Sequence, residues 1–214
     1  MREDTNTYGL RQWFHFSVSS RKAERYKFRI YKFSKYYSLY RDGMKPYICE
    51  DQLDWKQDGE NVKYEYDEEL KCFYVEFEYK FVKPHQKIFI AAQPPYAYSK
   101  LKDYLGLLVE QYPEIKIKKV GETLSGLDIP LIKICKKEEV REAVIVLART
   151  HPGETASSFS IETFIERIME KKELRDRFDF YILPMVNPDG VFFGNHRTSA
   201  IGQDLNRNFK FGDL

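Results

Sequence analysis

The sequence is poor in cysteine, and no part of it is apolar over a long stretch. Its three cysteines, Cys49, Cys72 and Cys135, are an odd number, lie far apart and form no CxxC pair. Reduced thiols are therefore favoured over a disulfide framework or a thiolate metal site. Nowhere do 18 apolar residues run together, and residues 1–6 are polar where a signal peptide needs an apolar core. We therefore expect a soluble, cytoplasmic protein without a membrane partner.

An excess of charge of one sign is also missing. Among 214 residues, 35 lysines and arginines stand against 33 aspartates and glutamates, which leaves a net charge of +2. A nucleic-acid-binding protein normally carries a basic field, so we expect no nucleic-acid partner. Hydrophobic residues make up 43% of the chain, which is enough for a buried core, and the length suits one large domain or two small ones.

The first 93 residues are typical of a domain made of β-strands. Apolar and polar residues alternate over residues 14–18, 26–30, 62–66 and 73–81, so each predicted strand buries one face. Turn residues separate these segments, and tyrosine and phenylalanine are frequent, as on a pleated, half-covered surface. The pattern predicts an all-β antiparallel sandwich domain over residues 1–93.

A basic, aromatic-rich stretch lies within this domain, around residues 27–40. It is open to two interpretations. One is a docking surface for an acidic partner. The other is a solvated strand face on which the stems of lysine and arginine cover apolar surface.

The segment Gln93-Pro94-Pro95 separates this domain from a different pattern, because two prolines interrupt both helix and sheet. The next pattern predicts a helix from Tyr98 to Tyr112, a second helix around residues 161–168, and strands over residues 115–117, 129–134, 143–148 and 178–183. The continuous apolar run at residues 143–148 indicates a strand buried on both faces. Alternating strands and helices predict an α/β domain over residues 94–214, with its site at the carboxyl ends of the strands.

The turn that follows residues 143–148 carries the clearest chemical signal. His151 and Glu154 are separated by Pro152-Gly153, a tight bend that can aim an imidazole nitrogen and a carboxylate oxygen at one point. A zinc ion with nitrogen and oxygen ligands requires that arrangement. The pattern is short, so a solvated loop that holds one histidine and one glutamate is the alternative.

Three further short motifs follow that turn within residues 187–208. In order, the four motifs are His151-Pro152-Gly153-Glu154, Asn187-Pro188-Asp189-Gly190, Gly194-Asn195-His196-Arg197-Thr198 and Gly202-Gln203-Asp204-Leu205-Asn206-Arg207-Asn208. Together they resemble the zinc metallocarboxypeptidases, and in particular the cytosolic carboxypeptidase branch. Residues 43–46 and 95–99 are also similar to that branch, whose members carry a β-sandwich before the catalytic domain. The resemblance implies that residues 94–214 are the amino-terminal part of an α/β catalytic domain, with a mixed sheet and flanking helices.

The resemblance also implies a zinc site. His151 and Glu154 correspond to two of the three protein ligands of one zinc ion, and Asp204 to the carboxylate that orients the ligand histidine. A carboxylate on the far nitrogen of an imidazole fixes its tautomer and raises its basicity. His196 lies within the same motifs and stays open between a role in the site and simple packing.

Three further residues are implied to act on the substrate. Arg197 would be catalytic, polarising the scissile carbonyl and stabilising its oxyanion, while Asn206 and Arg207 would bind the terminal carboxylate of the substrate. The chemistry is coherent, because a guanidinium fork matches a carboxylate and a fixed cation stabilises developing negative charge. The alternative for Arg197 and Arg207 is ordinary surface arginine in a loop.

The sequence departs from the family in one respect. The family takes a third zinc ligand, a substrate-contacting tyrosine and the general-base glutamate from positions well beyond the Asn-Arg motif, and this sequence ends at Leu214. We therefore expect an incomplete sheet with an open edge and an uncovered apolar face. With two of three ligands and no base, we expect the chain alone to be inactive.

Two functional hypotheses follow. The first is a zinc-dependent metallocarboxypeptidase that hydrolyses C-terminal residues, glutamate in particular, from protein or peptide tails, and that is truncated before the third ligand and the general base. The branch resemblance implies tubulin tails as substrates, and a second chain would complete the domain. The alternative is a catalytically inactive, shortened relative that binds acidic protein C-termini.

Overall fold

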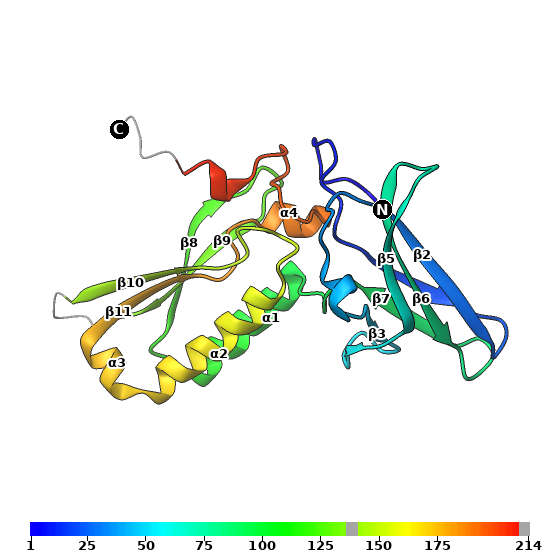
Figure 1. Cartoon of the computed structure of the whole chain (residues 1–214). Helices are drawn as coiled ribbons and strands as arrows, with labels where there is room; N and C mark the ends of the chain where they lie inside the picture. The colour runs from blue at the N-terminus through cyan, green and yellow to red at the C-terminus, as the bar shows by residue number, and fades with distance from the viewer. Residues whose placement is uncertain (136–140, 210–214) are drawn as a thin grey trace. The chain divides into compact units, whose positions relative to one another are not determined.

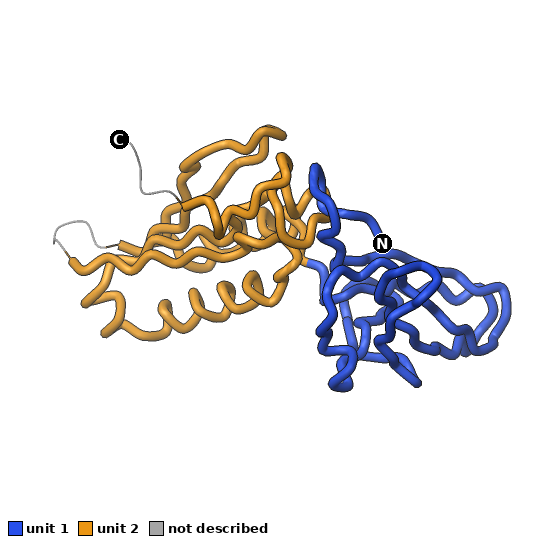
Figure 2. The backbone as a smooth tube through the Cα atoms, turned by 45° about the horizontal axis from the view of Figure 1, so that its top comes forward, with its two compact units in different colours: residues 1–95 blue, residues 96–214 orange. Residues whose placement is uncertain are grey.

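The chain divides into two compact units, Met1–Pro95 and Tyr96–Leu214, coloured separately in Figure 2. The structure is a computed structural model that describes residues 1–135 and 141–209. The domain boundary expected at residues 93 and 94 stays a prediction, because compactness alone does not show that each unit folds independently.

The first unit consists of two antiparallel sheets (Figure 1). One sheet has the strand order β1 (His15–Ser19), β7 (Lys87–Ala91), β3 (Tyr47–Cys49) and β4 (Lys56–Gln57). The other has the order β2 (Arg25–Phe33), β6 (Cys72–Lys80) and β5 (Glu60–Asp67), and a short 3-10 helix, η1 (Leu39–Asp42), lies between β2 and β3 in the chain. The two sheets form the antiparallel sandwich that the alternating pattern predicts.

The core of this unit is built from the alternating apolar residues. Val75 and Phe77 of β6 and Ile88 and Ile90 of β7 are completely buried, and these strands belong to opposite sheets. The rings of Phe28 and Phe77 stack with their centroids 5.3 Å apart. The period of two along each strand thus places one apolar set between the sheets.

Side chains of β2 lie over the other face of β6. These side chains belong to the basic stretch at residues 27–40, and their contacts show how part of that stretch is used. Glu76 is only 6% exposed, and Lys27 and Arg29 of β2 both pair with its carboxylate. Lys27 also lies 4.0 Å from Glu78. Because the antiparallel register sets Lys27 and Arg29 opposite Glu78 and Glu76, their charges are balanced within the sheet. This part of the stretch is a solvated strand face whose lysine and arginine side chains pair with glutamates of the neighbouring strand.

The second unit is a mixed sheet with helices. Its strand order is β10 (Glu142–Leu147), β11 (Phe178–Leu183), β9 (Asp128–Ile134) and β8 (Lys116–Glu122). The pair β10 and β11 is parallel, and the other two pairs are antiparallel. The helices are α1 (Tyr98–Gln111), α2 (Ala156–Glu170), α3 (Lys172–Arg177) and α4 (Pro188–Phe193), followed by a 3-10 turn, η2 (Leu205–Arg207). The predicted fold class, an α/β portion after an all-β sandwich, is confirmed.

Helices α1 and α2 lie on the same face of this sheet (Figure 1). Leu108 of α1 and Ile165 and Ile168 of α2 pack in one cluster with Ile132 and Ile182 of the sheet. The three- and four-residue spacing of the helical apolar residues is what aligns them on one side. Within the described residues, no helix combines the length and the apolar character needed to cross a membrane.

The prediction that residues 143–148 form a strand buried on both faces is wrong for the structure as described. Ile145 is 68% exposed and Leu147 is 47% exposed. Both helices of the core cover the face that carries Val144 and Val146, and among the described residues β10 pairs only with β11. An apolar run therefore indicated a strand correctly, but the second face of that strand lies open.

Substitution of one isoleucine on each face of the sheet should have unequal effects. Ile182→Ala empties a completely buried position and should lower the free energy of unfolding by about 2–5 kcal/mol. Ile145→Ala, on the open face, should change it by less than about 0.5 kcal/mol. Urea unfolding of both variants measures the difference. Equal losses would mean that the open face is covered in solution.

Candidate functional site

The candidate site lies where the two parallel strands of the second unit end. Backbone hydrogen bonds continue the pairing beyond β10 and β11: Ala148 donates to Leu183, Val186 donates to Ala148, and Asn187 donates to Arg149. Because parallel strands end at the same edge of a sheet, the turn after β10 and the loop after β11 lie side by side. The site is therefore built from loops on a rigid support.

The turn after β10 brings the two predicted zinc ligands together. His151 is buried, and its Nδ1 lies 3.0 Å from Oε1 of Glu154, whose side chain is 57% exposed. Two ligand atoms at tetrahedral zinc distances lie about 3.3 Å apart, given bond lengths of about 2.0–2.1 Å. The two donors therefore converge as an imidazole and a carboxylate around one ion would.

Asp204, which lies 53 residues further along the chain, binds the other side of the same imidazole. Its Oδ1 lies 3.0 Å from Nε2 of His151, and its Oδ2 accepts a hydrogen bond of 2.7 Å from Nε of Arg197. Oδ1 also accepts the backbone N–H of Asn206 and so caps η2. One carboxylate thus joins three of the residues that the sequence singled out.

The charge state of Asp204 follows from these contacts. Burial alone would raise the pKa of its carboxyl group, but hydrogen bonds from His151 and Arg197, and the positive charge on those groups, hold the pKa below its usual value. An ionised carboxylate only accepts hydrogen bonds, so Nε2 of His151 donates to Asp204. Nδ1 faces Glu154, and in a ligand histidine held in this way it is the nitrogen that would bind the metal.

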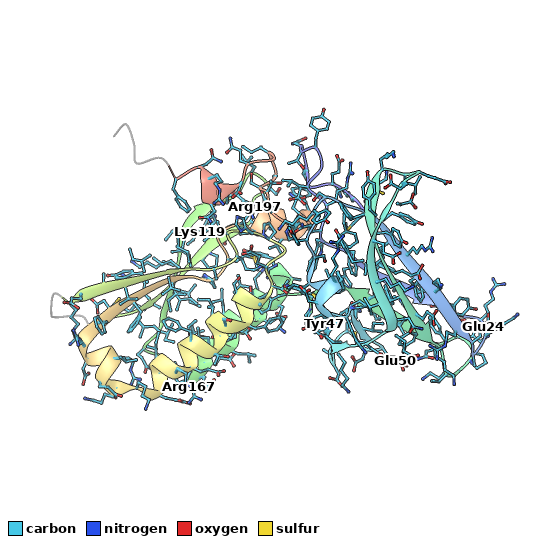
Figure 3. All side chains as sticks on the ribbon, in the orientation of Figure 1. Glu24, Tyr47, Glu50, Lys119, Arg167 and Arg197 are labelled. Carbon is cyan, nitrogen blue, oxygen red and sulfur yellow. The ribbon has the colours of Figure 1, made fainter. Side chains whose placement is uncertain are left out.

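The predicted substrate-binding residues lie close by in the chain. Arg197 lies on the loop between α4 and η2 (Figure 3), and Asn206 and Arg207 belong to η2. Arg207 is exposed, and its Nη1 donates to the backbone oxygen of Asn206 at 3.2 Å. Among residues 1–135 and 141–209, Arg207 forms no ion pair. Its guanidinium is thus accessible to an anionic ligand.

Two glycines allow these motifs to pack closely. Gly153 donates its N–H to the backbone oxygen of His196 at 2.8 Å, and a Cβ at Gly153 would lie 2.9 Å from that oxygen. A Cβ at Gly190 would lie 2.6 Å from the backbone oxygen of Thr198 and would collide with the ring of Pro152. A larger residue at either position would push the loops apart. His196 thus packs against Gly153 with its backbone and with Nδ1 of its ring, and its role in the site stays a prediction.

The contacts of Asn187 show what the motif at residues 187–190 does, to which the sequence analysis assigned no chemical role. Its Oδ1 accepts the N–H of Gly190 at 3.0 Å and caps α4, and Pro188 follows at the first helical position. Its Nδ2 donates to the backbone oxygen of Thr150. The side chain therefore ties α4 to the turn that carries His151.

Arg149 is the residue whose importance sequence reasoning missed. It is 3% exposed, and its guanidinium donates to the backbone oxygens of Pro152 and Tyr96 and to the hydroxyl of Ser158. Burial lowers the pKa of Arg149 to about 10, and the electrostatic influence of the Tyr96 hydroxyl and of Glu154 opposes this shift. The signals in the sequence were its place directly after a run of apolar residues and two positions before His151.

The donors fit a zinc ion as part of a ligand set. Imidazole nitrogen and carboxylate oxygen are both usual zinc ligands, and the hydrogen bond from His151 to Asp204 is the support that a ligand histidine normally has. Within residues 1–135 and 141–209, no group of three or more histidine, cysteine, aspartate or glutamate side chains is placed to hold a metal ion.

Comparison with known proteins bears on these residues. Residues 101–213 match the family model described as zinc carboxypeptidase. The chain is 34% identical to mouse cytosolic carboxypeptidase 3 over 232 residues and 35% identical to human cytosolic carboxypeptidase 2 over 236 residues. Each alignment covers 98% of this chain, but the chain spans only 23% and 26% of those relatives.

Solved structures give a similar result. The metallo-carboxypeptidase of Burkholderia cenocepacia superposes with a TM-score of 0.80 at 26% identity, covering 99% of this chain and 56% of its own. The metallo-carboxypeptidase of Pseudomonas aeruginosa, in complex with (2-guanidinoethylmercapto)succinic acid, superposes with a TM-score of 0.77 at 25% identity. That match covers 96% of this chain and 54% of the other.

The close packing at Gly153 predicts opposite effects for the same substitution at two glycines. Gly153→Ala places a methyl group against the backbone of His196 and should destabilise the protein by about 1–3 kcal/mol. Gly106 is an exposed interior residue of α1 with no atom within 4 Å of an added Cβ, so Gly106→Ala should stabilise by about 0.5–1 kcal/mol. Thermal unfolding compares them. Tolerance of Gly153→Ala would contradict the close approach of the two loops.

Proposed function

Since this chain belongs to the zinc carboxypeptidase family, we propose that it forms part of a metallocarboxypeptidase that removes residues from protein or peptide C-termini. The observation that carries the proposal is the contact between His151 and its two carboxylates. Nδ1 faces Glu154, Nε2 is held by Asp204, and the same Asp204 holds Arg197. A metal ligand and a cation for the carbonyl would thus be oriented by one group.

His151 and Glu154 are the proposed zinc ligands. A catalytic zinc normally has three protein ligands and one open position, so the third would come from outside the described residues. When bound, the ion polarises a carbonyl and makes water a stronger nucleophile at neutral pH. The contribution of Asp204 is to keep the proton on Nε2 of His151.

Arg197 is the proposed electrophilic group. Its Nε side is held by Asp204, which fixes the plane of the guanidinium. The terminal nitrogens are the donors that we assign to the oxygen of the scissile carbonyl. A fixed cation at that oxygen stabilises the negative charge that develops in the transition state.

Asn206 and Arg207 are the proposed binding residues for the terminal carboxylate. The exposed guanidinium of Arg207 can form two parallel hydrogen bonds to a carboxylate, a geometry that lysine cannot reproduce. The bond from the backbone N–H of Asn206 to Asp204 holds η2, and with it Arg207, at a fixed place relative to His151. Cleavage would then be restricted to the last residue of a chain.

The finer substrate class is proposed from the branch that the chain resembles. Relatives at 34% and 35% identity are named cytosolic carboxypeptidases, and we propose from this a cytoplasmic protein that removes glutamate from acidic tails such as those of tubulin. A comparison of peptides that end in glutamate, alanine or lysine tests this part separately from the carboxypeptidase chemistry.

A second candidate function is binding without hydrolysis. Its support is the exposed guanidinium of Arg207, whose proposed contact with a terminal carboxylate needs no metal ion. Such a protein would hold acidic C-termini through Asn206 and Arg207. A third ligand supplied from outside the described residues, for example by a second chain, would convert this candidate into the first.

The enzymatic proposal predicts zinc-dependent release of the last residue. The protein purified from its native source, incubated with zinc and a peptide that ends in glutamates, should release glutamate. Chelation of zinc or substitution of His151→Ala or Glu154→Ala in the same protein should abolish the release, because each removes the ion or one of its ligands. Mass spectrometry of the peptide measures the product.

The outcomes of this assay separate the candidates. Peptide that binds but stays intact supports binding without hydrolysis. Release that persists in both ligand variants contradicts the assignment of His151 and Glu154.

If Arg207 binds the terminal carboxylate, substitution of Arg207 and amidation of the peptide should remove the same interaction. Arg207→Lys should weaken binding of a peptide with a free C-terminus about tenfold or more, because the bidentate contact is lost. Amidation of the peptide should weaken binding to the unsubstituted chain similarly and have little further effect on the variant. Calorimetric titration of the four combinations gives the coupling.

The matched control is Arg167→Lys. Arg167 lies on α2, directed away from the sheet (Figure 3), and pairs with Glu170 at 2.7 Å. This substitution should leave peptide binding and its dependence on the free carboxylate unchanged. Additive effects of amidation and Arg207→Lys would show that Arg207 does not bind the terminal carboxylate.

A further inference from the structure

Arg149 is a buried arginine whose hydrogen-bond partners are all neutral. Its Nε and Nη2 both donate to the backbone oxygen of Pro152, at 3.0 and 2.6 Å. Its Nη1 donates to Ser158 Oγ at 2.9 Å and to the backbone oxygen of Tyr96 at 3.1 Å. Within the described residues, no carboxylate lies within 4.0 Å of this guanidinium. A buried charge is costly, so this arrangement needs a reason other than an ion pair.

The backbone conformation of Arg149 is also unusual for an arginine. Its φ is +52°, in the left-handed region that glycine adopts without strain. Its N–H donates to Ser157 Oγ, and its oxygen accepts from Asn187, so this conformation is held on both sides. Glycine would satisfy the backbone at lower cost. The presence of arginine therefore points to the side chain.

The acceptors of the guanidinium show what it holds. The oxygen of Pro152 lies in the middle of the turn, between His151 and Glu154 in the chain, and it receives two of the N–H donors. Ser158 belongs to α2 and Tyr96 precedes α1. The side chain therefore connects the centre of the turn to α2 and to the segment that leads into α1.

We propose that Arg149 is a positioning residue that holds the Pro152 peptide so that Nδ1 of His151 and Oε1 of Glu154 converge. This role rests on the proposed zinc site. It deepens that proposal, because the pair of donors depends on the turn as well as on Asp204. Arg149 itself touches neither the metal nor the substrate.

Three substitutions test the role. Arg149→Gly keeps the left-handed backbone and removes the clamp, and Arg149→Lys keeps the charge but loses the double contact with Pro152. Arg175→Lys is the matched control. Arg175 also donates its Nη1 to two backbone oxygens, of Ile168 and Met169, but at the end of α2 away from the turn.

Two readouts separate positioning from general stability. The first is the NMR signal of the ring nitrogens of His151 in the metal-free chain. The second is zinc affinity, measured by calorimetry with the metal alone. Both Arg149 variants should shift the ring signals toward those of an exposed histidine and weaken zinc binding on the order of tenfold. Arg175→Lys should change neither, whatever its melting temperature.

The outcomes are distinct. If Arg149→Gly and Arg149→Lys lower the melting temperature but leave the ring signals and zinc affinity as in the control, the positioning role is wrong. If the unsubstituted chain binds no zinc, the metal assignment fails, and the ring signals still decide the role of Arg149. If neither variant folds, hydrogen exchange at Arg149 Nε–H in the unsubstituted chain is measured. Slow exchange supports the clamp, and exchange as fast as in an exposed arginine overturns it.

Discussion

The hydrogen bonds of one carboxylate, Asp204, are the interaction on which the candidate site depends. Oδ1 lies 3.0 Å from Nε2 of His151 and accepts the N–H of Asn206, while Oδ2 accepts from Arg197. A single ionised side chain therefore orients the imidazole, a guanidinium and the start of η2 relative to one another. Without it, the buried imidazole would lose its acceptor, and three separate segments would lose their common partner.

Close packing makes those hydrogen bonds possible. Gly153 and Gly190 let the His-Glu turn, α4 and the loop at residues 194–199 approach within contact distance, and Asn187 ties α4 to Thr150. Beneath them, β10 and β11 are parallel and end at the same edge. The site is thus a set of loops fixed by a shared sheet edge.

Helices and strands could be predicted from the sequence where the pattern depends only on neighbouring residues. Alternation along β6 and the apolar stripe of α2 are properties of neighbouring residues, and both elements appear where the pattern predicts them. The error at β10 has the same origin. Six apolar residues in succession indicate a strand, but whether Ile145 is covered depends on what packs against the sheet. Likewise, the charge of Arg29 did not reveal its partner Glu76, which the strand register places opposite it.

The sequence by itself determined the kinds of chemistry present, because motif order and residue type are written along the chain. It identified His151, Glu154, Asp204, Arg197 and Arg207 as candidates. Only the tertiary structure decided which atoms meet: Asp204 reaches His151 across 53 residues, and the backbone oxygen of Pro152 receives Arg149. These contacts depend on how loops from different strands converge and on which side chains become buried. Hydrogen-bond geometry is set by distances of a few ångströms, and no local pattern in the sequence encodes them.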